Sequence, residues 1–172
     1  MHILTNLREV FAEYLEDNQF YQNPKELYEP NNYFLSIGGK RMRPVLVLLG
    51  AHLYRNNLKD ALPAALAIEY FHNFSLIHDD MMDNAPIRRG KTTIHEKYGP
   101  NTAVLSGDVL LVYAYKFLTK VPEENLKLVY EIFSETAIEV CEGQQLDMNF
   151  ETQSNVTEEE DIWMIRLKTS VV

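Results

Sequence analysis

Three aspartates and a run of basic residues lie close together near the middle of the sequence. Asp79, Asp80 and Asp83 fall within five residues, and residues 88–91 then read Arg-Arg-Gly-Lys. If a helix ends here, Asp79 and Asp83 are spaced i, i+4 and share one face. Mg²⁺ prefers such hard oxygen ligands and is usually held by one or two carboxylates, with water and phosphate oxygens completing its shell. The pattern predicts a magnesium-assisted diphosphate site.

A second basic cluster lies upstream. Residues 38–44 read Gly-Gly-Lys-Arg-Met-Arg-Pro, which places Lys40 and Arg43 at a predicted helix start, where free N–H groups and the helix dipole already favour an anion. His72 lies seven residues, or about two helical turns, before Asp79, so it should point the same way. Taken alone, the basic cluster could be a solvated turn, and His72 could be an ordinary core or surface histidine. With the aspartates, they indicate two anion sites.

The composition favours a globular domain and argues against nucleic-acid binding, an internal disulfide and a membrane segment. The chain has 172 residues, of which 46% are hydrophobic, enough for one globular domain with a core. The net charge of −9 argues against nucleic acid, whose binding requires a broad basic face. A single cysteine, Cys141, excludes an internal disulfide and fits a reducing cytoplasm. Because no signal peptide or run approaching about 20 apolar residues is visible, we expect no membrane segment.

The apolar periodicity predicts an all-α protein. Glycines and prolines are few, seven of each, and Leu, Ala, Glu and Lys fill the periodic stretches. A long helix is expected over 61–82, with Asp60 as its N-cap and a core-facing stripe. That stripe comprises Ile68, Phe71, Ser75, Leu76 and Met82. The remaining predictions are a polar connection over 18–30 and helices over 3–17, 45–53, 93–98, 101–119, 123–148 and from 157, behind a capping box of Thr157 and Glu160.

The C-terminal part carries further polar residues. Gln144 and Asp147 form an i, i+3 pair in an otherwise apolar helix, where a packing glycine with polar neighbours is the ordinary explanation. Lys168 and Thr169 add a cation and a hydroxyl, which are uninformative by spacing alone. The last segment, 158–172, has no glycine stop, proline or polar tail, and therefore looks cut within a helix.

Together these motifs resemble the trans-isoprenyl diphosphate synthases, the polyprenyl synthetase family that makes farnesyl, geranylgeranyl and longer polyprenyl diphosphates. The family's Gly-Gly-Lys-x-x-Arg-Pro motif matches 38–44, and its first aspartate-rich motif with trailing Arg-Arg-Gly matches 79–90. Its Gly-Gln-x-x-Asp and Lys-Thr motifs match 143–147 and 168–169, in the family's order. The resemblance covers the whole chain, as the N-terminal half to two thirds of a family member. The family's second aspartate-rich motif is absent.

The resemblance implies a fold and a reaction. The fold would be the N-terminal portion of an isoprenoid synthase helical bundle, a single domain over 1–172 that is incomplete at its C-terminus, with the active-site cavity between helices. The reaction would be head-to-tail prenyl transfer, in which Mg²⁺ draws the diphosphate from an allylic substrate. The carbocation-like carbon then adds to the double bond of isopentenyl diphosphate, and a proton leaves. Family members are expected to be homodimers.

The resemblance also implies site residues, carried over motif by motif. Those implied for the allylic diphosphate are the Mg²⁺ ligands Asp79 and Asp83, Asp80 as an assistant, Arg88, and Lys168 after Thr169 closes the site. Those implied to line the reaction centre are Gln144 and Asp147. Those implied for isopentenyl diphosphate are Lys40, Arg43, His72 and Arg89.

Product length is expected to depend on the residue beneath the aspartates. Phe74 lies five positions before Asp79, where a bulky ring would floor the tunnel for the growing chain, and Ser75 beside it is small. With no insertion between Asp79 and Asp83, the pattern resembles family members that make geranylgeranyl diphosphate, with farnesyl diphosphate next. The ordinary alternative makes Phe74 a core residue.

Three interpretations stay open: a fragment of a complete enzyme, a natural non-catalytic subunit of a heteromeric synthase, and a helical diphosphate-binding module without transferase activity. The abrupt apolar end at Val171-Val172 favours the fragment. Terpene cyclases also use an Asp-Asp-x-x-Asp helix, but they need no site for a second diphosphate. Lys40 and Arg43 therefore argue against a cyclase.

Overall fold

The computed structural model describes residues 2–54 and 57–171, so the predicted apolar end at Val172 lies outside the described residues. Across this part of the chain the regular elements are helices apart from one short hairpin, which confirms the all-α prediction. Within the same residues, no helix has the length and apolar character that crossing a membrane requires.

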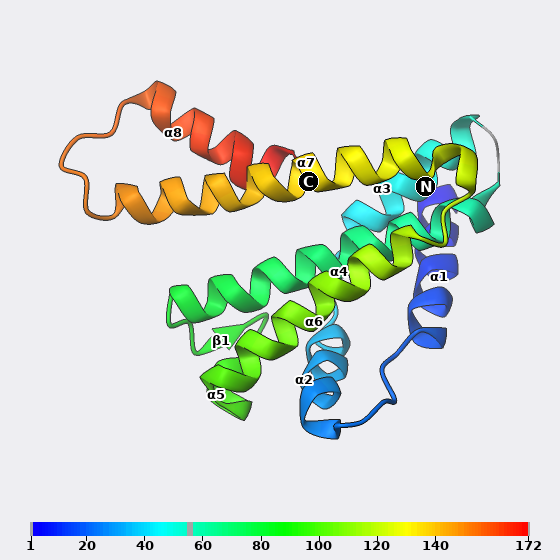
Figure 1. Ribbon diagram of the computed structural model, residues 1–172, viewed down its shortest axis with the longest axis horizontal. Coiled ribbons are helices and arrows are strands. Elements are labelled where there is room, and N and C mark those ends of the chain that lie inside the picture. The colour runs from blue at the N-terminus through cyan, green and yellow to red at the C-terminus, as the bar shows by residue number, and fades with distance from the viewer. Residues whose placement is uncertain (1, 55–56, 172) are drawn as a thin grey trace. The chain divides into compact units, whose positions relative to one another are not determined.

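The described chain divides into two compact units, one ending at Pro122 and one beginning at Glu123. The elements of the first unit are α1 (His2–Asp17), α2 (Lys25–Ser36), α3 (Met42–Tyr54), α4 (Leu58–Met82), β1 (Ile87–Arg88), β2 (Lys91–Thr92), α5 (Ile94–Tyr98) and α6 (Pro100–Leu118) (Figure 1). The elements of the second unit are α7 (Glu123–Phe150), α8 (Glu158–Ile165) and the π-helical turn η1 (Arg166–Ser170).

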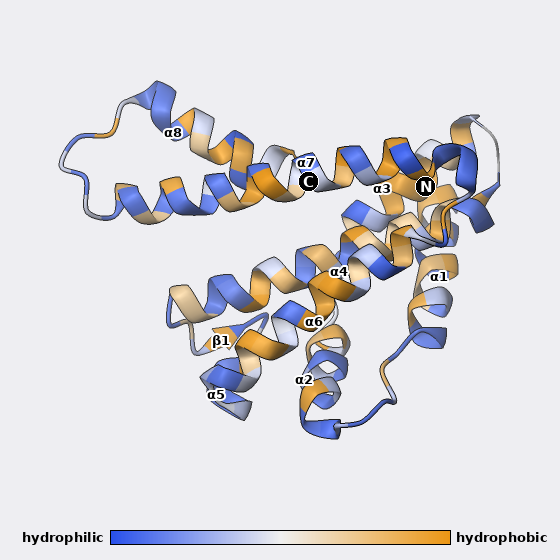
Figure 2. Cartoon of the chain, viewed as in Figure 1, coloured by the Kyte–Doolittle hydropathy of each residue, from blue (hydrophilic) through white to orange (hydrophobic). Residues whose placement is uncertain are grey.

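Helix α4 is the central element of the first unit. It packs along α6 and against α3, and hydrophobic residues are dense in all three helices (Figure 2). Because α4 has neighbours on more than one side, its buried residues are spread around the helix and do not form one stripe. The predicted stripe is therefore only partly right: Phe71 is buried, but Met82 is 49% exposed, while Leu66, Tyr70 and Ile77 are buried instead.

Two element boundaries differ from the sequence prediction. The connection predicted over 18–30 ends at Pro24, and α2 continues through Pro30. A proline inside a helix loses one hydrogen bond, but Pro30 and Phe34 are buried there, and this packing outweighs the loss. Asp60 is not the N-cap of α4, because the helix begins at Leu58, and Asp60 lies in the first turn.

The second unit is held together by close contact between α7 and η1. Gly143 of α7 faces the backbone of Leu167 and Lys168, where a side chain would collide. The predicted capping box at the start of α8 is confirmed. The Thr157 N–H donates to Glu160 Oε2 at 2.8 Å, and the Glu160 N–H donates to Thr157 Oγ1 at 3.3 Å. Hydrogen bonds that the Thr157 N–H and hydroxyl donate to the Glu160 carboxylate lower the pKa of that carboxyl.

Candidate functional site

The three aspartates lie at the end of α4 and differ in burial. Asp79 is partly buried, Asp83 is exposed as the C-cap residue, and the Asp83 N–H donates to Asp79 O at 2.9 Å. Asp80 is 1% exposed. The negative end of the helix dipole lies here as well, and no basic residue occupies the last turn of α4. This helix end therefore attracts cations.

The basic stretch forms a hairpin that supplies one of those cations. Strands β1 and β2 pair antiparallel, with Arg89 and Gly90 in the turn at φ values of 51° and 75°. A two-residue turn with both φ values positive matches the twist of a hairpin. Arg88, at the end of β1, donates through Nε to both oxygens of Asp80 at 2.7 and 2.8 Å. Its Nη2 lies 2.7 Å from Asp80 Oδ1.

The Arg89 side chain contacts a different part of the protein from that of Arg88. Its Nη1 donates to the carbonyl of Gly38, and a Cβ at Gly39 would lie 2.6 Å from the same nitrogen. Gly39 has a φ of 149°, a conformation that a side chain would also disfavour. The two adjacent arginines are thus divided: Arg88 lies at the aspartates and Arg89 at the glycine loop.

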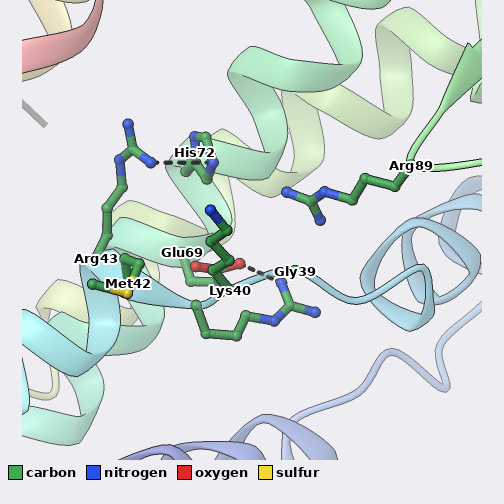
Figure 3. Close-up of a pocket in the computed structure, with 8 residues that line it drawn as sticks. Gly39, Lys40, Met42, Arg43, Glu69, His72 and Arg89 are labelled. Atoms are coloured by element: carbon green, nitrogen blue, oxygen red, sulfur yellow. Dashed lines mark hydrogen bonds and ion pairs between the residues drawn. The ribbon is translucent and has the colours of Figure 1, made fainter. Parts of the chain in front are cut away.

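The glycine loop and α4 together enclose a cavity of about 460 Å³ (Figure 3). Its lining residues are Gly39, Lys40, Arg41, Met42, Arg43, Glu69, His72 and Arg89. The structure therefore brings all four residues predicted for isopentenyl diphosphate to one cavity. Their role in binding stays a prediction, but a cavity with this many cations is chemically suited to a multiply charged anion.

The cations of this cavity are incompletely compensated. Burial lowers the pKa of Arg43, and burial followed by repulsion from Arg41 lowers that of Arg89. Arg43 Nε is buried, and no described residue accepts a hydrogen bond from it. A buried donor without an acceptor is unfavourable, so a bound anion would stabilise the cavity.

His72 is neutral here and serves as a hydrogen-bond acceptor. Burial, then the nearby Arg43, Arg89, Arg88 and Arg41, lower its pKa to about 3. Its Nε2 lies 3.3 Å from Arg43 Nη1, and a neutral imidazole accepts a hydrogen bond at that distance. In the free protein His72 therefore orients Arg43 and adds no positive charge of its own.

The helix end fits Mg²⁺ that shares its coordination with a substrate. Among the described residues no group of three or more His, Cys, Asp or Glu side chains forms a metal cage. Mg²⁺ needs only one or two carboxylates when phosphate oxygens and water fill its other positions. Asp79 and Asp83 are an oxygen-donor pair of this kind. Both oxygens of Asp80 accept hydrogen bonds from Arg88.

Two of the four predicted site residues of the second unit contact each other. Lys168 Nζ lies 2.5 Å from Asp147 Oδ2, so these two residues are an ion pair. Gln144 is half-buried on the same helix, and Thr169 is exposed in η1. A π-helical turn is rare and often marks a functional position.

Two residues of the first unit were missed from the sequence. Glu69 and Asn73 lie on α4, and both are buried beside the basic cavity. Their signal was present, because Glu69 and Asn73 are spaced i, i+4 and Glu69 precedes His72 by three residues. This spacing marks Glu69 and Asn73 as a pair, but it does not show that the charge partner of Glu69 is Arg41 of the glycine loop.

The fold and the site define an all-helical protein with a carboxylate-bearing helix end and a separate basic cavity along one helix. The chain belongs to the polyprenyl synthetase family, whose sequence profile matches residues 24–172. It is 46% identical over 151 residues to a geranylgeranyl diphosphate synthase of Methanosarcina mazei, covering 87% of this chain and 47% of the relative. It is 39% identical to a geranylgeranyl pyrophosphate synthase of Geoglobus acetivorans, covering 99% and 54%.

Solved structures give the same family and confirm the isoprenoid synthase type of fold. A crystal structure of a geranylgeranyl pyrophosphate synthase matches with a TM-score of 0.94 at 47% identity, over 97% of this chain and 51% of that one. A geranylgeranyl pyrophosphate synthetase of Pyrococcus horikoshii matches with a TM-score of 0.92 at 35% identity, over 99% and 54%. The chain spans about half the length of the curated relatives it matches.

Proposed function

We propose that this chain provides the substrate-binding part of a trans-prenyltransferase that condenses an allylic diphosphate with isopentenyl diphosphate. The product we propose is a short-chain polyprenyl diphosphate, geranylgeranyl or farnesyl. One observation carries the proposal: Arg88 and Arg89, adjacent in sequence, lie at two separate places along α4, the aspartate end, where a diphosphate would bind through Mg²⁺, and the basic cavity. A reaction that joins two diphosphates needs two such places.

The basic cavity is the proposed site of isopentenyl diphosphate. Lys40, Arg43 and Arg89 would bind its diphosphate, and Arg43 Nε would gain the acceptor it lacks among the described residues. His72 would hold the Arg43 guanidinium in place as a neutral acceptor. The apolar end of the substrate would extend toward the aspartate end of α4.

The aspartate end of α4 is the proposed site of the allylic diphosphate. Mg²⁺ held by Asp79 and Asp83 would neutralise the charge that develops as the diphosphate departs. Asp80 would contribute indirectly, because its two hydrogen bonds with Arg88 Nε fix that guanidinium beside the site. Charge neutralisation suffices for this departure, so the chain needs no nucleophilic serine or cysteine.

We extend the proposal to the second unit and to the assembled protein. Lys168, Thr169, Gln144 and Asp147 would have the roles that the family motifs imply, the first two at the allylic diphosphate and the others at the reaction centre. Residues 1–172 would belong to one isoprenoid synthase domain, active as a homodimer. A reducing compartment, the cytoplasm, fits a chain with one cysteine.

The test is a product assay with Mg²⁺, labelled isopentenyl diphosphate and allylic primers of increasing length, followed by chromatography of the dephosphorylated products. A C20 or C15 alcohol establishes the transferase and its product. Mg²⁺-dependent primer binding without product would show a binding subunit or an incomplete enzyme. Lys40→Ala and Arg43→Ala should weaken isopentenyl diphosphate far more than the primer, and equal losses for both would contradict the two-site assignment.

Product length gives a further prediction. The Phe74 ring lies beside Phe71 and His78, with centroids 5.8 and 4.7 Å away, one turn of α4 before the aspartates. Phe74→Ala removes this bulk, so the mutant should make longer products than the unaltered chain, as read by chromatography. Val112→Ala, an equally apolar change at an exposed position of α6, is the control. Unchanged product length in Phe74→Ala would make Phe74 a core residue only.

A further inference from the structure

The basic cavity contains a carboxylate. Among the described residues that line it, Glu69 is the one acidic side chain, and it is 3% exposed. A buried carboxylate is costly unless it is paired, and in an anion site it repels the ligand. Its presence therefore needs a physical reason.

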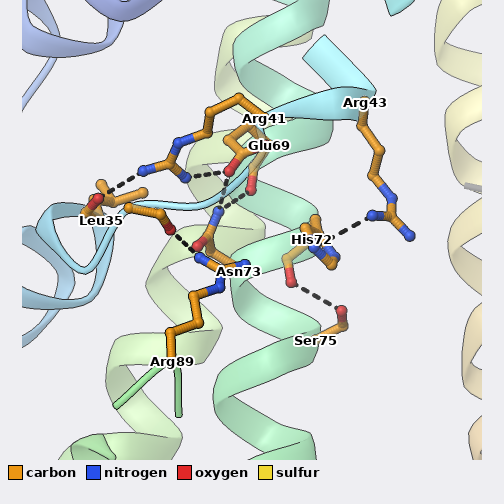
Figure 4. Close-up of polar contacts among 9 residues, drawn as sticks. Leu35, Arg41, Arg43, Glu69, His72, Asn73, Ser75 and Arg89 are labelled. Atoms are coloured by element: carbon orange, nitrogen blue, oxygen red, sulfur yellow. Dashed lines mark hydrogen bonds and ion pairs between the residues drawn. The ribbon is translucent and has the colours of Figure 1, made fainter. Parts of the chain in front are cut away.

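The partners of Glu69 supply that reason (Figure 4). Glu69 Oε1 accepts from Arg41 Nη1 as an ion pair and from Asn73 Nδ2 at 2.9 Å. Asn73 Nδ2 also donates to the Glu69 carbonyl at 2.6 Å, so the amide is fixed on α4. The other end of the Arg41 guanidinium donates to Leu35 O at 2.6 Å, in the last turn of α2. Arg41 thus joins α4 to the end of α2.

This link is made at Arg41, the residue of the glycine loop whose backbone conformation is energetically unfavourable. Gly38 and Gly39 have positive φ values, which glycine tolerates, but Arg41 also has a φ of 50°. A left-handed conformation costs a non-glycine residue about 1–2 kcal/mol, so surrounding contacts must hold it. Lys40 lies directly before Arg41 and Arg43 two residues after it, so the conformation of Arg41 decides where both ligand-binding cations lie.

We infer that Glu69 is a positioning residue for the isopentenyl diphosphate site: with Asn73, it holds Arg41 in its left-handed conformation and thereby fixes Lys40 and Arg43 around the diphosphate. This inference rests on the proposed function. In this role Glu69 acts through Arg41, whose guanidinium is engaged by Glu69 and Leu35 O and leaves the diphosphate to Lys40 and Arg43.

A positioning role and simple electrostatics predict opposite effects of Glu69→Gln on the affinity of the cavity for an anion. Replacing Glu69 by Gln removes a negative charge from a cationic cavity, which by electrostatics alone should tighten anion binding. If Glu69 positions the loop, the same change should weaken binding. The loss should reach about tenfold, the order expected for one charge-assisted hydrogen bond.

The experiment is calorimetric titration of the full chain without Mg²⁺, with inorganic diphosphate and with isopentenyl diphosphate as separate probes. Glu69→Gln should weaken both by about tenfold, while Mg²⁺-dependent binding of an allylic diphosphate stays at the level of the unaltered chain. Glu135→Gln, the same charge change at an exposed position of α7, should alter none of them. A merely structural defect would weaken the allylic ligand as well.

A second variant tests the link without changing any charge. Asn73→Ala removes one of the donors to Glu69, so positioning predicts weaker diphosphate binding and charge counting predicts no change. The double variant should bind no worse than Glu69→Gln alone, because the two residues act on the same guanidinium. If Glu69→Gln does not fold, Asn73→Ala decides by itself.

The outcomes separate this inference from the proposed function. Unchanged or tighter binding of inorganic diphosphate in Glu69→Gln or Asn73→Ala overturns the positioning role and leaves the proposed function standing. Binding of inorganic diphosphate but not isopentenyl diphosphate by the unaltered chain overturns the proposed function, while the effect of the variants on inorganic diphosphate still decides the positioning role. No binding of either probe overturns both.

Discussion

At the scale of single residues, burial and the neighbouring charges decide what each side chain of the basic cavity does. The motif residues Lys40, Arg43, His72 and Arg89 line one cavity, as motif spacing and family resemblance together implied. The protonation state of His72 could not be predicted, because it depends on burial and on arginines that come from two distant segments. The separation of Arg88 from Arg89 required the turn conformation of the hairpin.

The low pKa of His72 predicts a pH dependence of stability. A histidine with a folded-state pKa near 3 stays neutral in the folded protein while the unfolded chain takes up a proton below pH 6.5. Stability is therefore full above about pH 6.5 and decreases as the pH falls toward 3. Between pH 7 and 5 this single residue should reduce the free energy of unfolding by about 2 kcal/mol.

The measurement is urea unfolding of the unaltered chain and of His72→Gln at both pH values. Glutamine can accept from Arg43 through its amide oxygen but does not titrate, so the variant should lack this part of the pH dependence. Parallel pH profiles would mean that His72 titrates as an ordinary exposed histidine.

At the scale of elements, long periodic helices were predictable and their packing contacts were not. The ends of α6 and α7 lie close to the predicted ones. The start of α2 was missed, because Pro30 signals a break and only tertiary burial shows that the helix continues through it. Gly143 was recognised as part of a motif, but its close approach to η1 is a fact of packing.

Two glycine-to-alanine substitutions should change the stability of the protein in opposite directions. A Cβ on Gly143 would lie 2.8 Å from Leu167 C and Lys168 Cα, which are backbone atoms that cannot move aside easily. Gly143→Ala should therefore destabilise the second unit by about 2 kcal/mol. Gly50→Ala on α3 meets nothing within 4 Å and should stabilise the protein by up to about 1 kcal/mol through helix propensity.

Equilibrium unfolding gives the sign of each change, and hydrogen exchange of the amides of residues 166–170 shows whether the loss is local to η1. Equal stabilisation by both alanines would show that α7 and η1 do not approach closely in solution.

At the scale of the whole molecule, the residues proposed for the two substrates are distributed differently between the two compact units. Every residue that lines the basic cavity lies between positions 39 and 89, within the first unit. The carboxylates and Arg88 are also there, but Lys168, proposed for the allylic diphosphate, belongs to the second unit. The single domain over 1–172 that the family resemblance implied stays a prediction.

The division predicts that residues 1–122, expressed alone, keep isopentenyl diphosphate binding but lose affinity for the allylic diphosphate. The buried core of this unit, with Phe11, Leu48, Tyr70 and Leu110 almost fully enclosed, should keep it helical by circular dichroism. Its affinity for isopentenyl diphosphate should stay within about twofold of the full chain, the usual scatter for independent sites. Its Mg²⁺-dependent affinity for an allylic primer should fall, because Lys168 is missing. A folded unit that lost isopentenyl diphosphate binding would show that the basic cavity depends on residues beyond Pro122, whereas an unchanged primer affinity would remove Lys168 from the allylic site.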